Sequence, residues 1–357
     1  MTLGEDLVGE DTPDAEAGLG PGAQLEHLIH ELGRDPLFAM SLGSKELFHS
    51  NLLAWFTEHH PPVARALTGW DVPVTVHREK LHTDVLVTAD NRPPFVIENK
   101  MFSLPERHQL DRIAEKFAGQ QPELVLLSLS APAWAADGPW SWLSYRELAE
   151  RLRPAVDDVS AVDTYAGATF ERWLSLIDRM IALNHLVASP SDEEPLLLPT
   201  EVRELLGSAR LDAPVQKMRC QHVAARLGGS GITAEARLTN NLGLVEWFTE
   251  AADGLFWGWQ LQGEQFRLAL IVPEGHPGHG KSAAHKAARQ AEARQHPELF
   301  GFDPIDGAGA VGPQRLEFGD YQPCFVYRYV HIPGITIRQA VELGVAYTDR
   351  ISRLVSA

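Results

Sequence analysis

The chain has 357 residues, enough for two domains of ordinary size, and its 44% hydrophobic and 22% charged residues are typical of a globular protein. Its 31 Lys and Arg residues against 48 Asp and Glu give a net charge of −17, which excludes a protein that coats nucleic acid through bulk positive charge. There is no run of eighteen apolar residues and no charged-then-apolar N-terminal signal, and two cysteines are too few for a disulfide framework. We therefore expect a cytoplasmic protein that does not enter a membrane.

Residues 1–23 are acidic and rich in Gly and Pro, and we expect them to form a flexible tail. The first twenty residues hold six acids and no Lys or Arg, and without them the chain has 31 Lys and Arg against 42 Asp and Glu, a net charge of −11. Any contact of the remaining chain with nucleic acid must therefore depend on local basic patches or on a bound metal ion.

The hydrophobic pattern of residues 24–187 predicts an α/β fold in which helices flank a mixed central sheet. The expected elements, in chain order, are helices from residue 25 and at 46–56, strands at 72–76, 84–88 and 94–100, a helix at 105–117, a strand at 124–129 and helices near 144–153 and 169–186. Three consecutive strands can form a meander, and the helix before the fourth strand permits a parallel crossover.

Residues 188–200 begin with a run of Ser, Pro and acidic side chains, and they are the expected linker between two domains. Beyond them, residues 201–357 predict a C-terminal α/β (α+β) domain of unassigned role. Its expected elements are strands at 255–261, 266–272 and 324–330, helices near 282–294 and 335–354, and a glycine-rich loop at 301–313.

Two carboxylates and a lysine stand at the ends of two consecutive predicted strands. Asp84 begins one apolar run, and Glu98-Asn99-Lys100 ends the next. Positions 98 and 100 share one face of a strand because side chains alternate. A carboxylate and an ammonium are costly to bury there unless both are paired or bind a metal ion. We therefore expect Asp84, Glu98 and Lys100 to meet at one edge of the sheet.

This combination of groups suits phosphodiester hydrolysis. Two carboxylates, a main-chain carbonyl and water are oxygen ligands that Mg²⁺ prefers, and Mn²⁺ can take its place. The metal would polarise the phosphate and lower the pKa of water, while Lys100 would position the water and offset charge on the phosphate. The spacing by itself equally allows a structural ion pair between Lys100 and a carboxylate.

Asp84 followed by Glu98-Asn99-Lys100 at the end of an apolar strand resembles the signature of the PD-(D/E)xK nuclease superfamily. The resemblance extends over about residues 25–185. Two further features are similar to that family, Glu46 on the upstream helix and Gln109 on the helix after the lysine strand. The segment Trp142–Leu148 also resembles a segment of uncharacterised role in bacterial members. The sequence departs from the family at Thr83, where the family name has Pro, and at Ile113, where recombination nucleases have Tyr.

The resemblance implies a restriction-endonuclease-like core and a Mg²⁺-dependent nuclease whose expected substrate is DNA, in a group often linked to defence against foreign DNA. The expected metal ligands are Glu46, Asp84, Glu98 and Asn99. The expected catalytic residues are Asp84, Glu98, Lys100 and Gln109. The structural alternatives are that Glu46 only caps or solvates the end of its helix and that Gln109 is an ordinary exposed helix residue. Glu79 is a weaker candidate for an additional ligand.

Basic residues flank the proposed site in two stretches, at 77–82 and on the helix after Pro105, and they are able to hold phosphates locally. The expected nucleic-acid contacts are His49, Arg78, Lys80, Arg107 and Arg112. Solvated surface positions, and a packed neutral histidine at 49, are the structural alternatives. A protein this acidic also suggests a protein partner or a second copy of the chain that delivers the nucleic acid.

Two competing functions follow from other features of the chain. A catalytically silent nuclease fold would serve as a binding or scaffold module, although such a module needs no charged trio at a strand end. The segment Gly275–Ser282 fits the G-x(4)-G-K-[ST] pattern of a phosphate-binding loop, which would make the C-terminal part an NTPase-like regulator. Its internal Pro277 and the lack of a downstream strand ending in Asp favour a chance match.

Overall fold

The computed structural model describes residues 20–42, 45–103, 107–132, 138–240, 242–302 and 317–356, without the side chains of Lys45 and Arg107. The predicted acidic tail, apart from residues 20–23, and most of the predicted loop at 301–313 lie outside these residues. Among the described residues, the helices are too short or too polar to cross a membrane.

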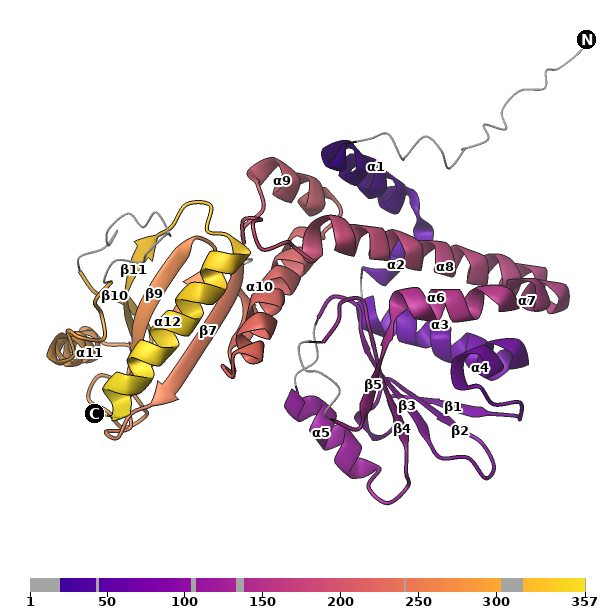
Figure 1. The fold of residues 1–357 in the computed structure, drawn as a ribbon, viewed down its shortest axis with the longest axis horizontal. Helices are drawn as coiled ribbons and strands as arrows, with labels where there is room; N and C mark the ends of the chain where they lie inside the picture. Colours follow the sequence, from indigo (N-terminus) through magenta and orange to yellow (C-terminus); the bar gives the residue numbers. More distant parts are fainter. Residues whose placement is uncertain are drawn as a thin grey trace, which may run out of the picture.

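The N-terminal part of the chain contains one sheet and the helices around it (Figure 1). Its elements are α1 (Pro21–Arg34), α2 (Pro36–Ser41), α3 (Lys45–His59), α4 (Pro61–Thr68), β1 (Thr75–Arg78), the 3₁₀ turn η2 (Lys80–His82), β2 (Val85–Thr88), β3 (Phe95–Lys100), α5 (Arg107–Lys116), β4 (Glu123–Ser128), β5 (Trp140–Ser144), α6 (Tyr145–Leu152), η3 (Arg153–Ala155), α7 (Val156–Val162), α8 (Thr164–Leu183) and η4 (Asn184–Ala188).

The five strands form a mixed sheet in the order β1-β2-β3-β4-β5. Strands β1, β2 and β3 are antiparallel neighbours, and β3, β4 and β5 run parallel. The predicted meander and the parallel crossover through α5 are therefore confirmed. Strand β5 was not predicted, because its Trp-Ser-Trp-Leu-Ser sequence is short and follows a stretch rich in Ala, Pro and Gly.

The two faces of this sheet are covered by different helices. On one face, Val85, Ile97 and Leu127 belong to a large core with residues of α3, α6 and α8. On the other face, Val96 and Leu126 pack in a smaller core with residues of α5. Figure 1 shows α5 apart from the remaining helices of this part.

The C-terminal part contains a six-stranded antiparallel sheet in the order β10-β11-β9-β8-β7-β6. The elements after η4 are α9 (Thr200–Ser208), α10 (Asp212–Gly229), β6 (Glu235–Thr239), β7 (Leu242–Glu250), β8 (Phe256–Gln262), β9 (Gln265–Ile271), α11 (Ala283–Gln295), β10 (Gly319–Tyr321), β11 (Phe325–His331) and α12 (Ile337–Ser356). The predicted strands and helices of this part are confirmed, and its arrangement is the α+β one. Strands β6, β7 and β10 and helices α9 and α10 were not predicted.

Helix α10 belongs to both hydrophobic cores. Val215 and Met218 pack into the N-terminal core, and Val223 and Leu227 pack into the C-terminal core. The predicted linker at 188–200 is packed in the same region, since Leu196 is 4% exposed. The polar backbone groups of this segment must therefore find hydrogen bonds inside the protein.

Arg219 on α10 supplies several of these hydrogen bonds and is completely buried. Its guanidinium donates to the carbonyl oxygens of Val187 at 2.6 Å and Leu196 at 3.1 Å, and to that of Pro195. A planar group with five donors satisfies several carbonyls at once, which a lysine cannot do in the same geometry.

Replacing Arg219 should weaken the junction between the two cores. Arg219→Met leaves three buried carbonyls without their donor, so we expect a loss of about 3–5 kcal/mol in the free energy of unfolding. Arg153→Ala, which removes a half-exposed ion pair with Asp178, should cost less than about 1 kcal/mol. Urea unfolding followed by circular dichroism measures both, and equal losses would contradict this role of Arg219.

Candidate functional site

The register of β2 and β3 brings the predicted site residues together. Val85 pairs with Ile97, so Asp84 lies beside Glu98. Ile97 belongs to the core on the α3 side and Val96 to the core on the α5 side, and alternation then sends Glu98 and Lys100 toward α5. The sequence predicted this shared face correctly.

A polar pocket of about 380 Å³ opens where β3 ends. Its lining residues are Glu46, Glu79, His82, Thr83, Asp84, Glu98, Asn99, Lys100 and Gln109. Four carboxylates thus face one ammonium group, which gives the pocket an excess of negative charge. His82 belongs to the basic stretch 77–82 that was predicted to flank the site, while Thr83 was not predicted to line it. Both belong to the turn that leads from β1 into Asp84.

Glu98 is held by two donors. The Lys100 Nζ lies 2.9 Å from Glu98 Oε1, and Gln109 Nε2 donates to the same oxygen at 2.7 Å. The side chains of Glu98 and Lys100 are only 4% and 15% exposed. Lys100 thus pairs with a carboxylate and Gln109 lies close to the site, both as predicted. Neither donor binds the second carboxylate oxygen, Glu98 Oε2.

Burial and mutual repulsion raise the pKa values of two carboxylates of this pocket, Glu98 and Asp84. Burial first, and then the charges of Asp84 and Glu46, raise the pKa of Glu98 from its ordinary 4.5 to about 7, although Lys100 acts against this shift. Burial likewise raises the pKa of Asp84, against the opposing effect of the Asn99 amide, which donates to Asp84 Oδ2 at 2.7 Å. Burial by itself would lower the pKa of Lys100, but the adjacent Glu98 raises it, so Lys100 stays charged.

Glu46 reaches the pocket from α3, as predicted. Its Oε1 accepts a hydrogen bond of 2.8 Å from the Ser103 hydroxyl, in the segment after β3. Ser103 was not predicted, because it lies in irregular backbone where periodicity gives no signal. The side chain of the predicted ligand Asn99 is 1% exposed and points away from Glu98 and Lys100, so only its main-chain carbonyl is available for a metal.

The prediction that His49 contacts nucleic acid is wrong in this structure. His49 is 2% exposed, and its Nδ1 accepts a hydrogen bond of 3.1 Å from Trp173 Nε1. Burial lowers the pKa of His49 to about 3, so the ring is neutral. The packed neutral histidine that the sequence also allowed is the one observed.

The other predicted nucleic-acid contacts differ in how exposed their side chains are. Lys80 and Arg112 are exposed, while Arg78 is half-buried and its Nε donates to Asn51 Oδ1 at 2.8 Å. The side chain of Arg107 lies outside the described residues. Glu79, beside Arg78 and Lys80, adopts a positive φ of 54° and lines the pocket.

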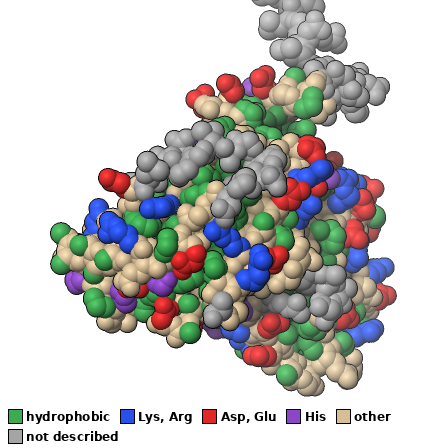
Figure 2. All heavy atoms as spheres, turned by 60° about the vertical axis from the view of Figure 1, so that its left-hand side comes forward, with side chains coloured by type: hydrophobic (Ala, Val, Ile, Leu, Met, Phe, Trp, Pro, Cys, Tyr) green, Lys and Arg blue, Asp and Glu red, His purple; other side chains and the backbone are tan. Residues whose placement is uncertain are grey.

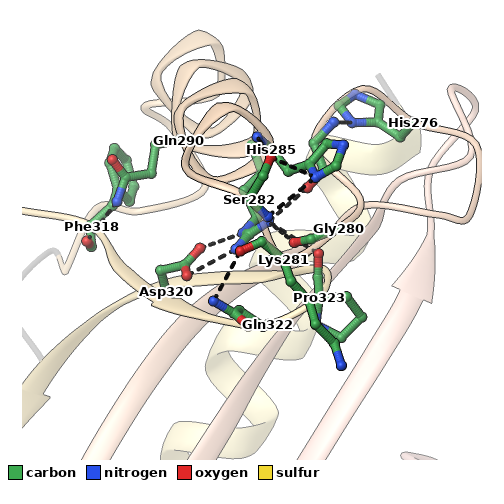
Figure 3. A network of polar contacts seen from close by, with 12 residues as sticks. His276, Gly280, Lys281, Ser282, His285, Gln290, Phe318, Asp320, Gln322 and Pro323 are labelled. Carbon is green, nitrogen blue, oxygen red and sulfur yellow. Dashed lines mark hydrogen bonds and ion pairs between the residues drawn. The ribbon is translucent and has the colours of Figure 1, made fainter.

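The segment Gly275–Ser282 is not arranged as a phosphate-binding loop. In such a loop the backbone amides are free to donate to phosphate oxygens. Here the amides of residues 278, 279, 280 and 282 all donate within the protein, for example Gly280 to the carbonyl of Pro323 at 2.8 Å (Figure 3).

Arg289 of α11 fills the space under this segment. It is completely buried, and its Nε and Nη2 donate to the two carboxylate oxygens of Asp320. Its Nη1 donates to the carbonyl oxygens of Gly278 and Gly280 at 2.8 and 2.9 Å. The loop amides and the Arg289 guanidinium thus already have partners inside the protein, so the NTPase-like interpretation has no structural support here.

No three Asp, Glu, His or Cys side chains of the described residues approach each other closely enough to form a preformed metal cage. Mg²⁺, however, is commonly held by one or two carboxylates together with water and substrate phosphates. The donors of the pocket fit that mode of binding. Comparison of the chain with family models, with curated proteins and with solved structures gave no match.

The raised pKa of Glu98 has a measurable effect on stability. The folded state binds the Glu98 proton more tightly than the unfolded state, so the contribution of this group to stability falls as pH rises from about 4.5 to 7. In metal-free protein, we expect Glu98→Gln to raise the free energy of unfolding at pH 8 by up to about 3 kcal/mol and to change it little at pH 5.

Chemical unfolding of the two proteins with a chelator present, at both pH values, measures this difference. Glu123→Gln, at the exposed start of β4, is the control and should show no such dependence. An equal effect of Glu98→Gln at pH 5 and pH 8 would contradict the raised pKa.

Proposed function

We propose that the chain is a metal-dependent nuclease that hydrolyses phosphodiester bonds of nucleic acid, with DNA as the expected substrate. The observation that carries this proposal is the contact of 2.9 Å between Lys100 Nζ and Glu98 Oε1 in a pocket that Asp84 and Glu46 also line. The proposal includes a restriction-endonuclease-like core, which the meander β1-β2-β3 and the parallel pair β3-β4 support.

Asp84 and Glu98 are the residues that would hold Mg²⁺, with Glu46 as an additional carboxylate and the Asn99 carbonyl as a neutral donor. When bound, the metal would supply Lewis acidity toward a phosphate oxygen. The electrostatics support such a cation, because four carboxylates share a pocket with one ammonium and two of them have raised pKa values. A cation would relieve this repulsion.

Lys100 and Gln109 act from the protein side. Lys100 keeps its proton at neutral pH, so its ammonium is able to hold a water molecule by hydrogen bonding and to offset negative charge that develops on the phosphate. Gln109 fixes Glu98 through its 2.7 Å hydrogen bond. Both groups are thus set before substrate arrives, and no reorganisation is needed at the moment of reaction.

Substrate binding would depend on a few local cations. Lys80 follows the pocket residue Glu79, Arg112 lies on the helix of Gln109, and both are exposed. Phosphate contacts of such residues position a nucleic acid without reading its sequence. On the face in Figure 2, the described Lys and Arg side chains are interspersed with Asp and Glu and form no single basic area. A chain of net charge −17 would accordingly bind nucleic acid weakly by itself, which favours delivery by a partner or a second copy.

A silent binding module is the second candidate. It is favoured by the fact that Glu98 Oε1 already accepts two internal hydrogen bonds, and by the lack of a preformed cage among the described residues. In such a module the ion pair of Glu98 and Lys100 would serve only to fix the end of β3.

Cleavage separates these two functions. We expect the wild-type protein with Mg²⁺ or Mn²⁺ to cut supercoiled or linear DNA, and Lys100→Ala to lower the rate by about two orders of magnitude or more, because the water and the phosphate lose their cationic partner. Lys286→Ala, an exposed lysine on α11, is the matched control and should cut normally. Equal cutting by wild type and Lys100→Ala would place the activity elsewhere.

Metal binding is testable without activity. We expect Mn²⁺ or Mg²⁺ to raise the melting temperature of the wild-type protein, since a ligand at a hundredfold excess over its dissociation constant stabilises by about 2.7 kcal/mol. Asp84→Asn and Glu98→Gln should reduce this shift, because each removes an anionic oxygen from the site. A shift of the same size in the control Glu123→Gln and in both site variants would contradict a metal site at this pocket.

A further inference from the structure

The segment Trp142–Leu148 connects β5 to α6 and has a defined structure. Ser144 caps α6, and its hydroxyl accepts from the Glu147 amide at 3.1 Å while the Glu147 carboxylate accepts from the Ser144 amide at 3.0 Å. This capping box fixes the first turn of the helix. Tyr145, the first residue of α6, is completely buried, and its hydroxyl donates to Asn99 Oδ1 at 2.6 Å.

Asn99 is hydrogen-bonded to the two other elements that supply the expected metal ligands, the helix of Glu46 and the start of β2 at Asp84. Its Nδ2 donates to the main-chain oxygen of Glu46 at 3.0 Å and to the Ser50 hydroxyl at 2.9 Å, both on α3. Its backbone amide donates to Asp84 Oδ2 at 2.7 Å, at the start of β2. Asn99 also lies between Glu98 and Lys100 in the chain. It therefore helps to fix the positions of four residues, which are Glu46, Asp84, Glu98 and Lys100.

We propose that Tyr145 and Ser50 are positioning residues for the catalytic centre and that both act through Asn99. This inference rests on the proposed nuclease function and assigns a role to the Trp142–Leu148 segment. Tyr145 orients the side chain of Asn99, Ser50 accepts from it, and Asn99 then holds Glu46 at a set distance from the Glu98–Lys100 pair. Neither Tyr145 nor Ser50 lines the pocket.

The hydrogen-bonding capacity of Asn99 explains why an asparagine is needed at this position. Both hydrogens of Nδ2 are used, by Glu46 and Ser50, and Oδ1 accepts from Tyr145. An aspartate cannot donate to a carbonyl, and an apolar side chain would leave the buried Tyr145 hydroxyl without its acceptor and would remove the donor to Ser50 and to the Glu46 carbonyl. Burial also raises the pKa of Tyr145 well above its ordinary value, so its hydroxyl remains a donor at any working pH.

Ser50 on α3 provides a second hydrogen-bonded connection between Asn99 and the main-chain carbonyl of Glu46. The Ser50 hydroxyl donates to the main-chain oxygen of Glu46 at 2.8 Å while it accepts from Asn99. The first turn of α3 is thereby held at two points against the end of β3. Removal of either point should let Glu46 shift relative to Lys100, and a displacement of about 1 Å can reduce turnover by about a hundredfold.

The variants Tyr145→Phe and Ser50→Ala test this role, because each removes one hydroxyl and keeps the shape of the core. Thr57→Val is the matched control for Ser50→Ala, since Thr57 is a buried α3 residue whose hydroxyl donates to the carbonyl four residues earlier, at 2.7 Å. Thr348→Val is the control for Tyr145→Phe, since it removes a buried hydrogen bond to Trp259 in the C-terminal part.

Cleavage kinetics are measured with all four variants at saturating Mg²⁺. We expect Tyr145→Phe and Ser50→Ala to lower kcat by about 10- to 100-fold with a smaller change in KM, and the double variant to cost little more than the larger single effect. Thr57→Val and Thr348→Val should keep wild-type kcat even where their melting temperatures fall. Wild-type kcat in both test variants, or equal losses in the controls, would overturn the inference.

Amide exchange of Asn99 in the metal-free protein gives a readout that does not depend on cleavage. We expect faster exchange of this amide in Tyr145→Phe and Ser50→Ala than in the wild type, and no change in the two controls, because the bond to Asp84 loosens when the Asn99 side chain is released. If the wild-type protein neither cuts nor binds Mn²⁺, the proposed function fails, and exchange alone decides the positioning role. Unchanged exchange in both test variants would then overturn it.

Discussion

The pleat of β3 is the constraint from which the site follows. Residues 95, 97 and 99 face the large core on the α3 side, and residues 96, 98 and 100 face α5. The same strand therefore presents Glu98 and Lys100 to the pocket and Asn99 to the interior. A shift of register by one residue would exchange these two sets, burying the ion pair in the core and exposing the asparagine.

The pocket is electrostatically unbalanced while the cores around it are well packed. Burial raises the pKa of Glu98 and Asp84, and the two groups repel each other across adjacent strands. Such strain on charged groups is costly to the fold and is characteristic of sites that bind a cation or move protons. The surrounding hydrogen bonds, from Asn99, Gln109 and Ser103, keep the carboxylates in place despite their repulsion.

Elsewhere in the chain, two buried arginines donate hydrogen bonds to main-chain carbonyls. Arg219 satisfies main-chain carbonyls at the junction of the two cores, and Arg289 satisfies those of the segment Gly275–Ser282. In both places one guanidinium donates to several main-chain carbonyls at once. The segment Gly275–Ser282 therefore resembles a phosphate-binding loop in sequence only, because its backbone amides donate to partners within the protein.

The sequence by itself determined the mixed sheet and the face shared by Glu98 and Lys100, because periodicity and strand alternation are local properties. The presence of Glu46 and Gln109 near them was implied by the resemblance to the PD-(D/E)xK superfamily. The tertiary structure decided which of the candidate side chains are engaged in contacts inside the protein. It buried His49 against Trp173, engaged the Asn99 side chain with Tyr145 and α3, and brought Ser103 to Glu46. These contacts join residues far apart in the chain or in irregular backbone, and no local pattern encodes the packing that creates them.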